Sequence, residues 1–424
     1  MKWAHKLIGD LCLHTDQCDP RDCPDEPFEY IDISSVDKNL KAVIGSQTII
    51  GAEAPSRARK QIQFGDILVA TVRPNLNAVA IIAEELDDQI ASTGFCVLRA
   101  DTKVLHNRYL FYRTITPEFV GHLVAQMRGA NYPAVTDQAV KDVPIPLPPL
   151  SEQRRIVEIL DQADDLRKKR AEADAKTSRI LPAIFYRMFG DPANNPRGWP
   201  VVNLGNLISE GPQNGLYKHA SHYGDGTPIL RIDSFYDGKV TNLEGLRRLR
   251  LSEADTVRYK LEMDDIVINR VNSLEFLGKS ALIPQLPETT VFESNMMRFS
   301  VDQGCILPEF LIELLQLPFA KHQILRRAKD AINQSSINQQ DVKGLQIPLP
   351  NLDLQIAFTN KVKALRTSNN MAADCRIAVD AIFQSLLHRA FSGDLTARWR
   401  EAHMEELLEE MEHQALALGV GAIQ

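Results

Sequence analysis

Two stretches of this chain are nearly the same. "VKDVPIPLPPLSEQRRIV" occupies residues 140–157 and "VKGLQIPLPNLDLQIAFT" occupies residues 342–359, so that the shared I-P-L-P recurs after 202 residues. Matches at this spacing continue beyond the shared prolines, for example between Gln153 and Gln355. In a chain of 424 residues, which is too long for one core, such a repeat predicts two copies of one folding unit.

The first part of each copy is rich in predicted strands. "FGDILVATV" at residues 64–72 and "MDDIVINRV" at residues 263–271 are short β-branched runs bounded by turn-forming residues. Short helical patterns lie between such runs, as at residues 307–327. The pattern predicts an α+β chain with strand-rich domains over residues 1–149 and 191–351.

The second part of each copy predicts one long helix, over residues 150–190 and 352–392. Apolar or small residues recur there at nearly heptad spacing, which is typical of a coiled coil. The stripe consists of Ile156, Ile159, Ala163, Leu166, Ala173, Ile180 and Ile184 in the first copy, and of Phe358, Val362, Leu365, Ala372, Cys375, Val379, Ile382 and Leu386 in the second.

Prolines set the limits of these helices. The arm "PIPLPPL" stops just before the first helix, because proline cannot continue a helix and pushes its predecessor into extended geometry. We expect Ser151 and Asp353 to be N-caps, since their side-chain oxygens can accept free backbone N–H groups. Pro182 has no counterpart in the second copy, and it predicts a break near Ile180.

Charge is distributed unevenly. The net charge is −7, but residues 1–30 and 399–424 together carry −9, which leaves the body at about +2. A nearly neutral body can still present basic faces, so the overall charge does not exclude a nucleic-acid partner. The tail at residues 393–424 is acidic, and its pattern favours a helical, solvated extension.

Cysteine usage does not indicate a disulfide-rich protein. Cys12, Cys18 and Cys23 cluster near His5 and His14, which leaves a metal site open as an alternative. The cluster has no C-x-x-C spacing, so free thiols are the preferred interpretation.

Several functional classes find no support in the sequence. No apolar run approaches the ~20 residues of a membrane helix, and the first residues lack a signal-peptide core, so we expect a cytoplasmic protein without a membrane partner. Methyltransferase, metalloprotease and dinucleotide-binding motifs do not occur, and "LGKS" at residues 277–280 is preceded by Ser273 where a P-loop needs glycine. This pattern favours recognition over catalysis.

With its I-P-L-P-P-L-S-E-Q arm opening a long helix, and with a second arm after another strand-rich domain, the chain resembles the DNA-specificity subunit of type I restriction-modification systems. The resemblance covers roughly residues 1–395. The second arm departs from the pattern, because S-E-Q becomes Asp353-Leu354-Gln355 and the second proline becomes Asn351.

The resemblance implies two tandem α/β target-recognition domains, separated by two long antiparallel helices that form a coiled coil, with a pseudo-two-fold internal repeat. Each domain would read one half of a bipartite, asymmetric site in double-stranded DNA. The helices would set the spacer and dock two methyltransferase subunits, which motor-nuclease subunits would join. It implies no cofactor in this chain, since S-adenosylmethionine, ATP and Mg²⁺ would be used by the partners.

Polar residues in loops after the strands are the candidates for DNA contacts. Arginine suits guanine, asparagine and glutamine suit adenine, and basic clusters suit phosphates. The candidates are Arg73, Asn75 and Asn77 of "TVRPNLN"; Asn131 and Tyr132 of "RGANYPAVT"; Lys218 of "QNGLYKHASHYGDG"; Arg270, Asn272 and Ser273 of "NRVNSLEF"; Lys321, Arg326, Arg327 and Lys329; and Asn333, Gln334 and Ser335 of "DAINQSSIN". The alternative is that such residues serve turn geometry.

Two other functions stay open at this point. A coiled-coil adaptor could hold two domains for protein ligands without DNA, and its binding would not show the steep salt dependence of phosphate contacts. An enzyme with an unfamiliar site, such as a nuclease, would show turnover by the isolated chain.

Overall fold

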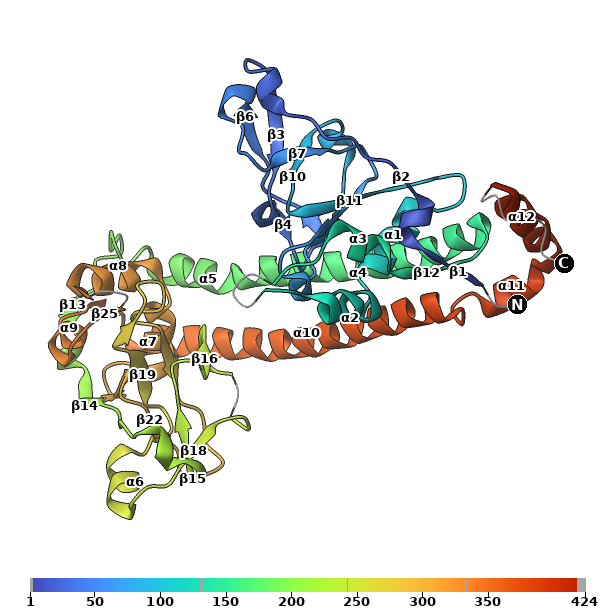
Figure 1. The fold of residues 1–424 in the computed structure, drawn as a ribbon. Helices are drawn as coiled ribbons and strands as arrows, with labels where there is room; N and C mark the ends of the chain where they lie inside the picture. The colour runs from blue at the N-terminus through green and yellow to red at the C-terminus, as the bar shows by residue number, and fades with distance from the viewer. Residues whose placement is uncertain (1–2, 130–132, 242, 332–333, 418–424) are drawn as a thin grey trace. The chain divides into compact units, whose positions relative to one another are not determined.

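The computed structural model describes residues 3–129, 133–241, 243–331 and 334–417, and it divides into two compact units (Figure 1). Unit 1 comprises Met1–Ala173 with Ala373–Gln424, and unit 2 comprises Asp174–Ala372. Each unit holds one strand-rich domain and a segment of both long helices. The compact units therefore differ from the repeats along the sequence, because each long helix is divided between them.

The domain of unit 1 is built on two four-stranded sheets, with orders β6-β3-β10-β7 and β2-β11-β8-β9, and on the pairs β1-β12 and β4-β5. Its strands are β1 (Ala4–Leu7), β2 (Cys12–Leu13), β3 (Pro27–Ile31), β4 (Val36–Asp37), β5 (Ala42–Val43), β6 (Gln47–Ile50), β7 (Ala58–Gln61), β8 (Ile67–Ala70), β9 (Val79–Ile81), β10 (Ile90–Ser92), β11 (Phe95–Ala100) and β12 (Pro144–Leu147).

The domain of unit 2 has a six-stranded sheet of order β14-β23-β19-β21-β17-β16, two three-stranded sheets, β18-β15-β22 and β20-β25-β24, and the pair β13-β26. Its strands are β13 (Val201–Asn203), β14 (Ile208–Asn214), β15 (Tyr223–Leu230), β16 (Phe235–Tyr236), β17 (Gly238–Val240), β18 (Arg247–Leu249), β19 (Ile266–Asn269), β20 (Val271–Asn272), β21 (Ser280–Leu282), β22 (Val291–Phe292), β23 (Met296–Val301), β24 (Lys329–Ala331), β25 (Gln334–Ser336) and β26 (Gln346–Pro348).

Helices follow the strands in both units, so the predicted mixture of α and β structure is confirmed. The α-helices are α1 (Asn107–Thr114), α2 (Pro117–Gln126), α3 (Asp137–Lys141), α4 (Leu150–Ser178), α5 (Ile180–Phe189), α6 (Glu253–Tyr259), α7 (Pro308–Leu315), α8 (Pro318–Arg327), α9 (Gln339–Lys343), α10 (Leu352–Ser392), α11 (Ala397–Ala402) and α12 (Met404–Ala417).

The predicted break near Ile180 is confirmed. Helix α4 ends at Ser178 and α5 begins at Ile180, two residues before Pro182. A proline ring crowds the carbonyl four residues earlier and offers no N–H to it, so the ladder is interrupted at this point. Helix α10 has Gln384 at the corresponding position and continues unbroken to Ser392.

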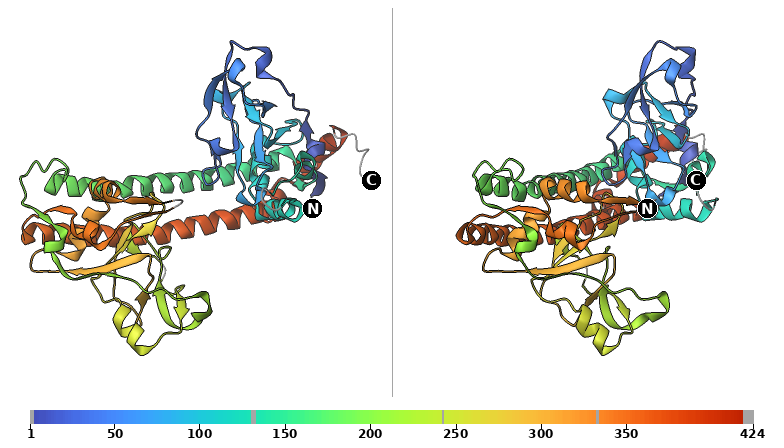
Figure 2. Two further views of the ribbon diagram at one scale, coloured as in Figure 1. Left: turned by 60° about the vertical axis from the view of Figure 1, so that its left-hand side comes forward. Right: turned by 90° about the vertical axis from the view of Figure 1, so that its left-hand side faces the viewer.

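Within unit 1, the segments of α4 and α10 lie side by side and run in opposite directions (Figures 1 and 2). Glu152 near the start of α4 accepts hydrogen bonds from Thr396 Oγ1 at 2.6 Å and from Arg400 Nε at 2.8 Å, just beyond the end of α10. Further along α4, Arg167 Nε lies 2.9 Å from Asp380 Oδ1. The partner numbers fall as the α4 numbers rise, which defines the antiparallel sense.

The same aromatic contact supports the core of both units. Tyr109 packs on Phe391 with ring centroids 5.0 Å apart in unit 1, and Phe310 packs on Phe189 at 5.0 Å in unit 2. The predicted apolar stripe is only partly buried.

Leu166 and Ile382, both assigned to the stripe, are 56% and 58% exposed, whereas the neighbouring Phe383 and Leu387 are 1% exposed. The cause is the 3.6-residue period of the helix, which turns a strict heptad stripe away from the core over several turns.

The expected N-caps are wrong, because both helices begin one residue before them. Asn351 caps α10, since its Oδ1 accepts from Leu354 N at 3.0 Å. Pro149 occupies the N-cap position of α4 and has no side-chain acceptor. Glu410 of α12 accepts from the first turn of α4 instead. Its carboxylate accepts from Ser151 N at 3.0 Å and also from the Ser151 hydroxyl.

The acidic tail is helical, but it is docked on unit 1 as far as the structure describes it. Leu407 of α12 is buried, and Gln414 Nε2 donates to Val104 O at 2.8 Å. Arg400 of α11 lies over the Trp3 ring at 4.7 Å. Of the described helices, none is long and apolar enough to cross a membrane.

Candidate nucleic-acid interface

Two predicted loops meet in unit 1. The segment after β8 pairs with the segment before α3, through a bridge between Val72 and Ala134. Arg73 N donates to Pro133 O at 2.8 Å, and Val135 N donates to Thr71 O at 2.9 Å. Arg73 has φ +50°, in the left-handed region where a residue with a Cβ is rarely held. The hydrogen bonds of Arg73 N and Thr71 O to the neighbouring loop hold Arg73 in this conformation.

The corresponding loops meet in unit 2. Strand β20 pairs with β25, with Val271 opposite Ser336 and Asn272 opposite Ser335. Ile337 N donates to Arg270 O at 2.9 Å, which repeats the bond from Val135 to Thr71. The two loop segments that the sequence singled out in each copy are therefore brought together, at equivalent places in the two units.

A third segment completes each loop pair and carries a basic side chain. In unit 1, Arg128 exchanges backbone hydrogen bonds of 3.0 and 2.9 Å with Ala134. In unit 2, Lys329 of β24 lies opposite Ser336. Both basic side chains are exposed. Arg128 was not among the predicted candidates, although it opens the "RGANYPAVT" stretch. It corresponds to Lys329 in the second copy, and this correspondence could have indicated it.

Six of the predicted DNA-contacting residues are exposed on or near these loops. They are Arg73, Asn75, Ser273, Arg326, Lys329 and Gln334. Arginine, asparagine and glutamine side chains present the paired donors and acceptors that base edges require, and arginine also suits phosphates. These positions stay candidates for DNA contact.

Lys321 braces a loop of its own unit. Its Nζ donates to Leu274 O at 2.9 Å, to Glu275 O at 2.8 Å and to Leu277 O at 2.8 Å. An ammonium group has three donors, and all three are used here. Partial burial lowers the pKa of Lys321. This residue shapes the loop that carries Ser273.

Other predicted contacts have their polar groups engaged in the same way. Asn77 donates to Thr114 O at 3.0 Å and accepts from Lys41 Nζ at 2.7 Å. Arg327 donates to Gln323 O at 3.0 Å and to Gly344 O at 2.9 Å. Such bonds favour the alternative of loop geometry for these side chains.

Four further candidates are also partly withdrawn from solvent or paired. Arg270 is half-buried and donates to Ser294 O at 3.2 Å, while Asn272 accepts from Ser273 N at 2.8 Å. Lys218 forms an ion pair of 2.9 Å with Asp255. Ser335 is buried.

Three candidates lie outside the described residues. They are Asn131 and Tyr132 of the first loop pair and Asn333 of the second.

The cysteine cluster forms no metal site among the residues that the structure describes, where no group of three His, Cys, Asp or Glu side chains converges. Burial raises the pKa of the Cys12 thiol to about 12. Cys23 is exposed, whereas Cys18 is half-buried. The described cysteines form no disulfide with one another.

Comparisons with known proteins find similarity to one family. Residues 1–173 match the family model for the type I restriction modification DNA specificity domain. This match covers the domain of unit 1 and the part of α4 that belongs to it.

Relatives extend the similarity over most of the chain. The EcoKI specificity subunit of Escherichia coli (strain K12) is 26% identical over 363 residues, which cover 80% of this chain and 77% of that protein. The putative MjaX specificity subunit of Methanocaldococcus jannaschii is 34% identical over 162 residues, 38% of this chain and 37% of that one.

Solved structures agree. A chain from work on complex assembly and conformational transition of the type I R-M system superposes with a TM-score of 0.58 and 28% identity, over 93% of this chain and 98% of that one. The type I S subunit from M. genitalium, at 15% identity and a TM-score of 0.51 over 92% of this chain and 96% of that one, supports the fold alone.

Residues 1–173 thus match the DNA specificity domain of type I restriction modification, and the chain is similar over most of its length to specificity subunits of type I restriction enzymes.

Proposed function

We propose that this chain reads a bipartite, asymmetric site in double-stranded DNA, with the domain of each unit contacting one half. The observation that carries the proposal is the recurrence of one loop arrangement in both units. In each, two paired loops are joined by a segment with an exposed basic residue, Arg128 or Lys329. Basic residues beside polar loops provide phosphate contacts for positioning and side chains for reading bases.

The two halves of the site should differ in sequence, because equivalent positions carry different chemistry. Arg73 follows β8, and Asn272 stands at the corresponding place in unit 2. Arginine favours guanine and asparagine favours adenine in the major groove. The chain would thus have two unlike reading surfaces on one repeated framework.

The long helices would have two roles in this proposal. As an antiparallel coiled coil between two tandem target-recognition domains, residues 1–149 and 191–351, they would set the length of the unread spacer. Their outer faces would dock two methyltransferase subunits, and motor-nuclease subunits would complete the restriction complex. S-adenosylmethionine, ATP and Mg²⁺ would be bound by those partners.

Salt-dependent binding tests the proposal. The chain, in complex with its methyltransferase partner, is titrated with a pool of random duplexes at rising salt, and the bound duplexes are sequenced. We expect affinity to fall steeply with salt and the bound pool to be enriched in a two-part motif. An unenriched pool would leave a protein-binding adaptor as the better description.

A further inference from the structure

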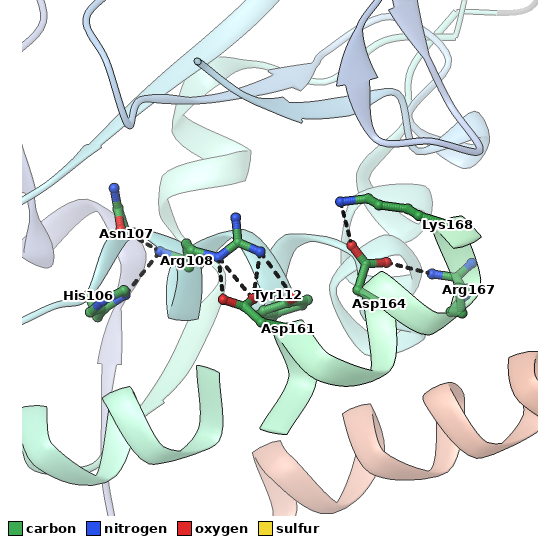
Figure 3. A network of polar contacts seen from close by, with 8 residues as sticks. All are labelled: His106, Asn107, Arg108, Tyr112, Asp161, Asp164, Arg167 and Lys168. Atoms are coloured by element: carbon green, nitrogen blue, oxygen red, sulfur yellow. Dashed lines mark hydrogen bonds and ion pairs between the residues drawn. The ribbon is translucent and has the colours of Figure 1, made fainter. Parts of the chain in front are cut away.

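An ion pair joins the domain of unit 1 to its long helix. Arg108 of α1 and Asp161 of α4 meet with Nε 2.9 Å from both carboxylate oxygens, and the Tyr112 hydroxyl donates to the same carboxylate at 2.6 Å. Figure 3 shows both α1 side chains directed at Asp161. A two-oxygen contact of this kind fixes geometry as well as charge.

The charges are reversed at the same place in unit 2. There α7 contributes Glu309 and α10 contributes Lys363, with Nζ 3.1 Å from Oε1. One turn further along α7, the nearly buried Glu313 is bonded to Arg366 of α10. The domain helix is therefore basic and the long helix acidic in unit 1, while in unit 2 the domain helix is acidic and the long helix basic.

The equivalence of the positions rests on backbone contacts and not on the charges. His106 N donates to Gln153 Oε1 at 2.8 Å, and Leu307 N donates to Gln355 Oε1 at 2.9 Å. These bonds set the same register between α1 and α4 as between α7 and α10. Arg108 and Glu309 follow two residues after the donors, and Asp161 and Lys363 follow eight residues after the glutamines.

Apolar packing at this contact does not distinguish the two units strongly. Ile156 and Leu160 are buried under the domain in unit 1, as are Phe358 and Val362 in unit 2. Burial of apolar surface is non-directional, so either domain could in principle cover either helix segment. A domain on the wrong segment would, however, place Arg108 against Lys363 or Glu309 against Asp161.

Ion pairs inside the domains keep one polarity, which makes the reversal specific to the docking contact. Asp66 pairs with Arg99 at 2.8 Å in unit 1, and Asp265 pairs with Arg298 at 3.3 Å in unit 2. In both, the acid precedes a central strand and the arginine is on the adjacent strand.

We propose that the reversed charge pairing determines which long-helix segment each domain packs against. The face of α1 fits an acidic helix segment, and the face of α7 fits a basic one. Like charges across the contact disfavour the wrong combination, which is how charge pairs select partners in other helical interfaces. The inference concerns assembly of the fold and does not rest on DNA recognition.

Charge reversal in the full chain provides the first test. R108E and D161K should each lower the unfolding midpoint by about 3 °C or more, and R108E/D161K should recover most of the loss. E309K, K363E and their combination should behave in the same way. R155E, E158R and their combination are the matched control, because this exposed pair lies within α4 alone. Absence of recovery in both double variants would overturn the proposal.

A chain carrying residues 1–149 in place of 191–351 provides the second test. Its second Arg108 would face Lys363, and K363D/R366D would supply the acids that α4 has at 161 and 164. We expect K363D/R366D to raise the unfolding midpoint of this chain and to lower that of the natural chain. An effect of the same sign in both chains, or failure of the two-copy chain to fold even with K363D/R366D, would contradict selection by charge.

Discussion

Gln153 and Gln355 make the same three hydrogen bonds in the two units. Gln153 accepts from His106 N and donates to Val104 O and Pro148 O, and Gln355 accepts from Leu307 N and donates to Cys305 O and Pro350 O. Both side chains are fully buried. Each glutamine thus joins the proline arm, the start of the long helix and the loop before the domain helix.

Removal of this side chain should destabilise unit 1 strongly. Q153A leaves His106 N without its acceptor, whereas Val104 O and Pro148 O keep Gln414 Nε2 as a donor. One group left unpaired costs about 1–3 kcal/mol, so we expect a loss of about that size in the free energy of unfolding, measured by urea titration. Q138A removes an exposed glutamine from the same domain and should be nearly neutral. Equal effects of the two substitutions would count against a structural role for Gln153.

The glutamines also mark what the sequence could predict. The repeat aligned Gln153 with Gln355, and Pro182 indicated the break in the first long helix. Both features are visible in the order of the residues alone. The residue that caps α4 could not be predicted in this way. Glu410 reaches Ser151 across 259 residues, and no pattern near the helix start indicates a partner so far away.

The contact of Glu410 with Ser151 should hold α12 in place. E410A removes the acceptor for the first turn of α4, and loss of an N-cap acceptor costs about 0.5–2 kcal/mol. We expect faster amide hydrogen exchange over residues 404–417 together with the first turn of α4. E409A changes an exposed neighbour on the same helix and is the control. Unchanged exchange in E410A would show that other contacts suffice for docking.

Buried thiols should make unit 1 less stable in alkali. Burial raises the pKa of Cys96 from 9.0 to about 12, so the folded chain keeps this proton while the unfolded chain loses it. The unfolded state then binds fewer protons, and stability falls as pH rises from 9 toward 12. C96A should show a shallower fall, by up to about 1.4 kcal/mol per pH unit, in urea titrations between pH 8 and 10.5. C23A, which changes an exposed cysteine, should retain the original slope.

Basic residues beside the paired loops should contribute to DNA binding through phosphates. R128A and K329A should each weaken binding to all duplexes and reduce the slope of log K against log salt by about 0.9. K103A removes an exposed lysine from the loop between β11 and α1 and serves as the control. A loss confined to one DNA sequence would instead indicate base reading by these side chains.

The candidate site was predicted at the level of loops more than of side chains. Sequence reasoning found the segments around Arg73 and Gln334, since repeat position and turn composition are visible there. The sequence does not indicate that Lys321 donates to three backbone carbonyls or that Ser335 is buried, because both depend on the path of neighbouring loops.

Mapping of methylated adenines tests the central claim most directly. Cells that carry this chain and its partner subunits would be sequenced for modified bases, alongside cells in which residues 1–149 come from a relative. We predict one motif of two unlike halves around a spacer of fixed length, with only one half changed by the exchange. A single uninterrupted motif, or an exchange that alters both halves, would contradict the assignment of one domain to each half.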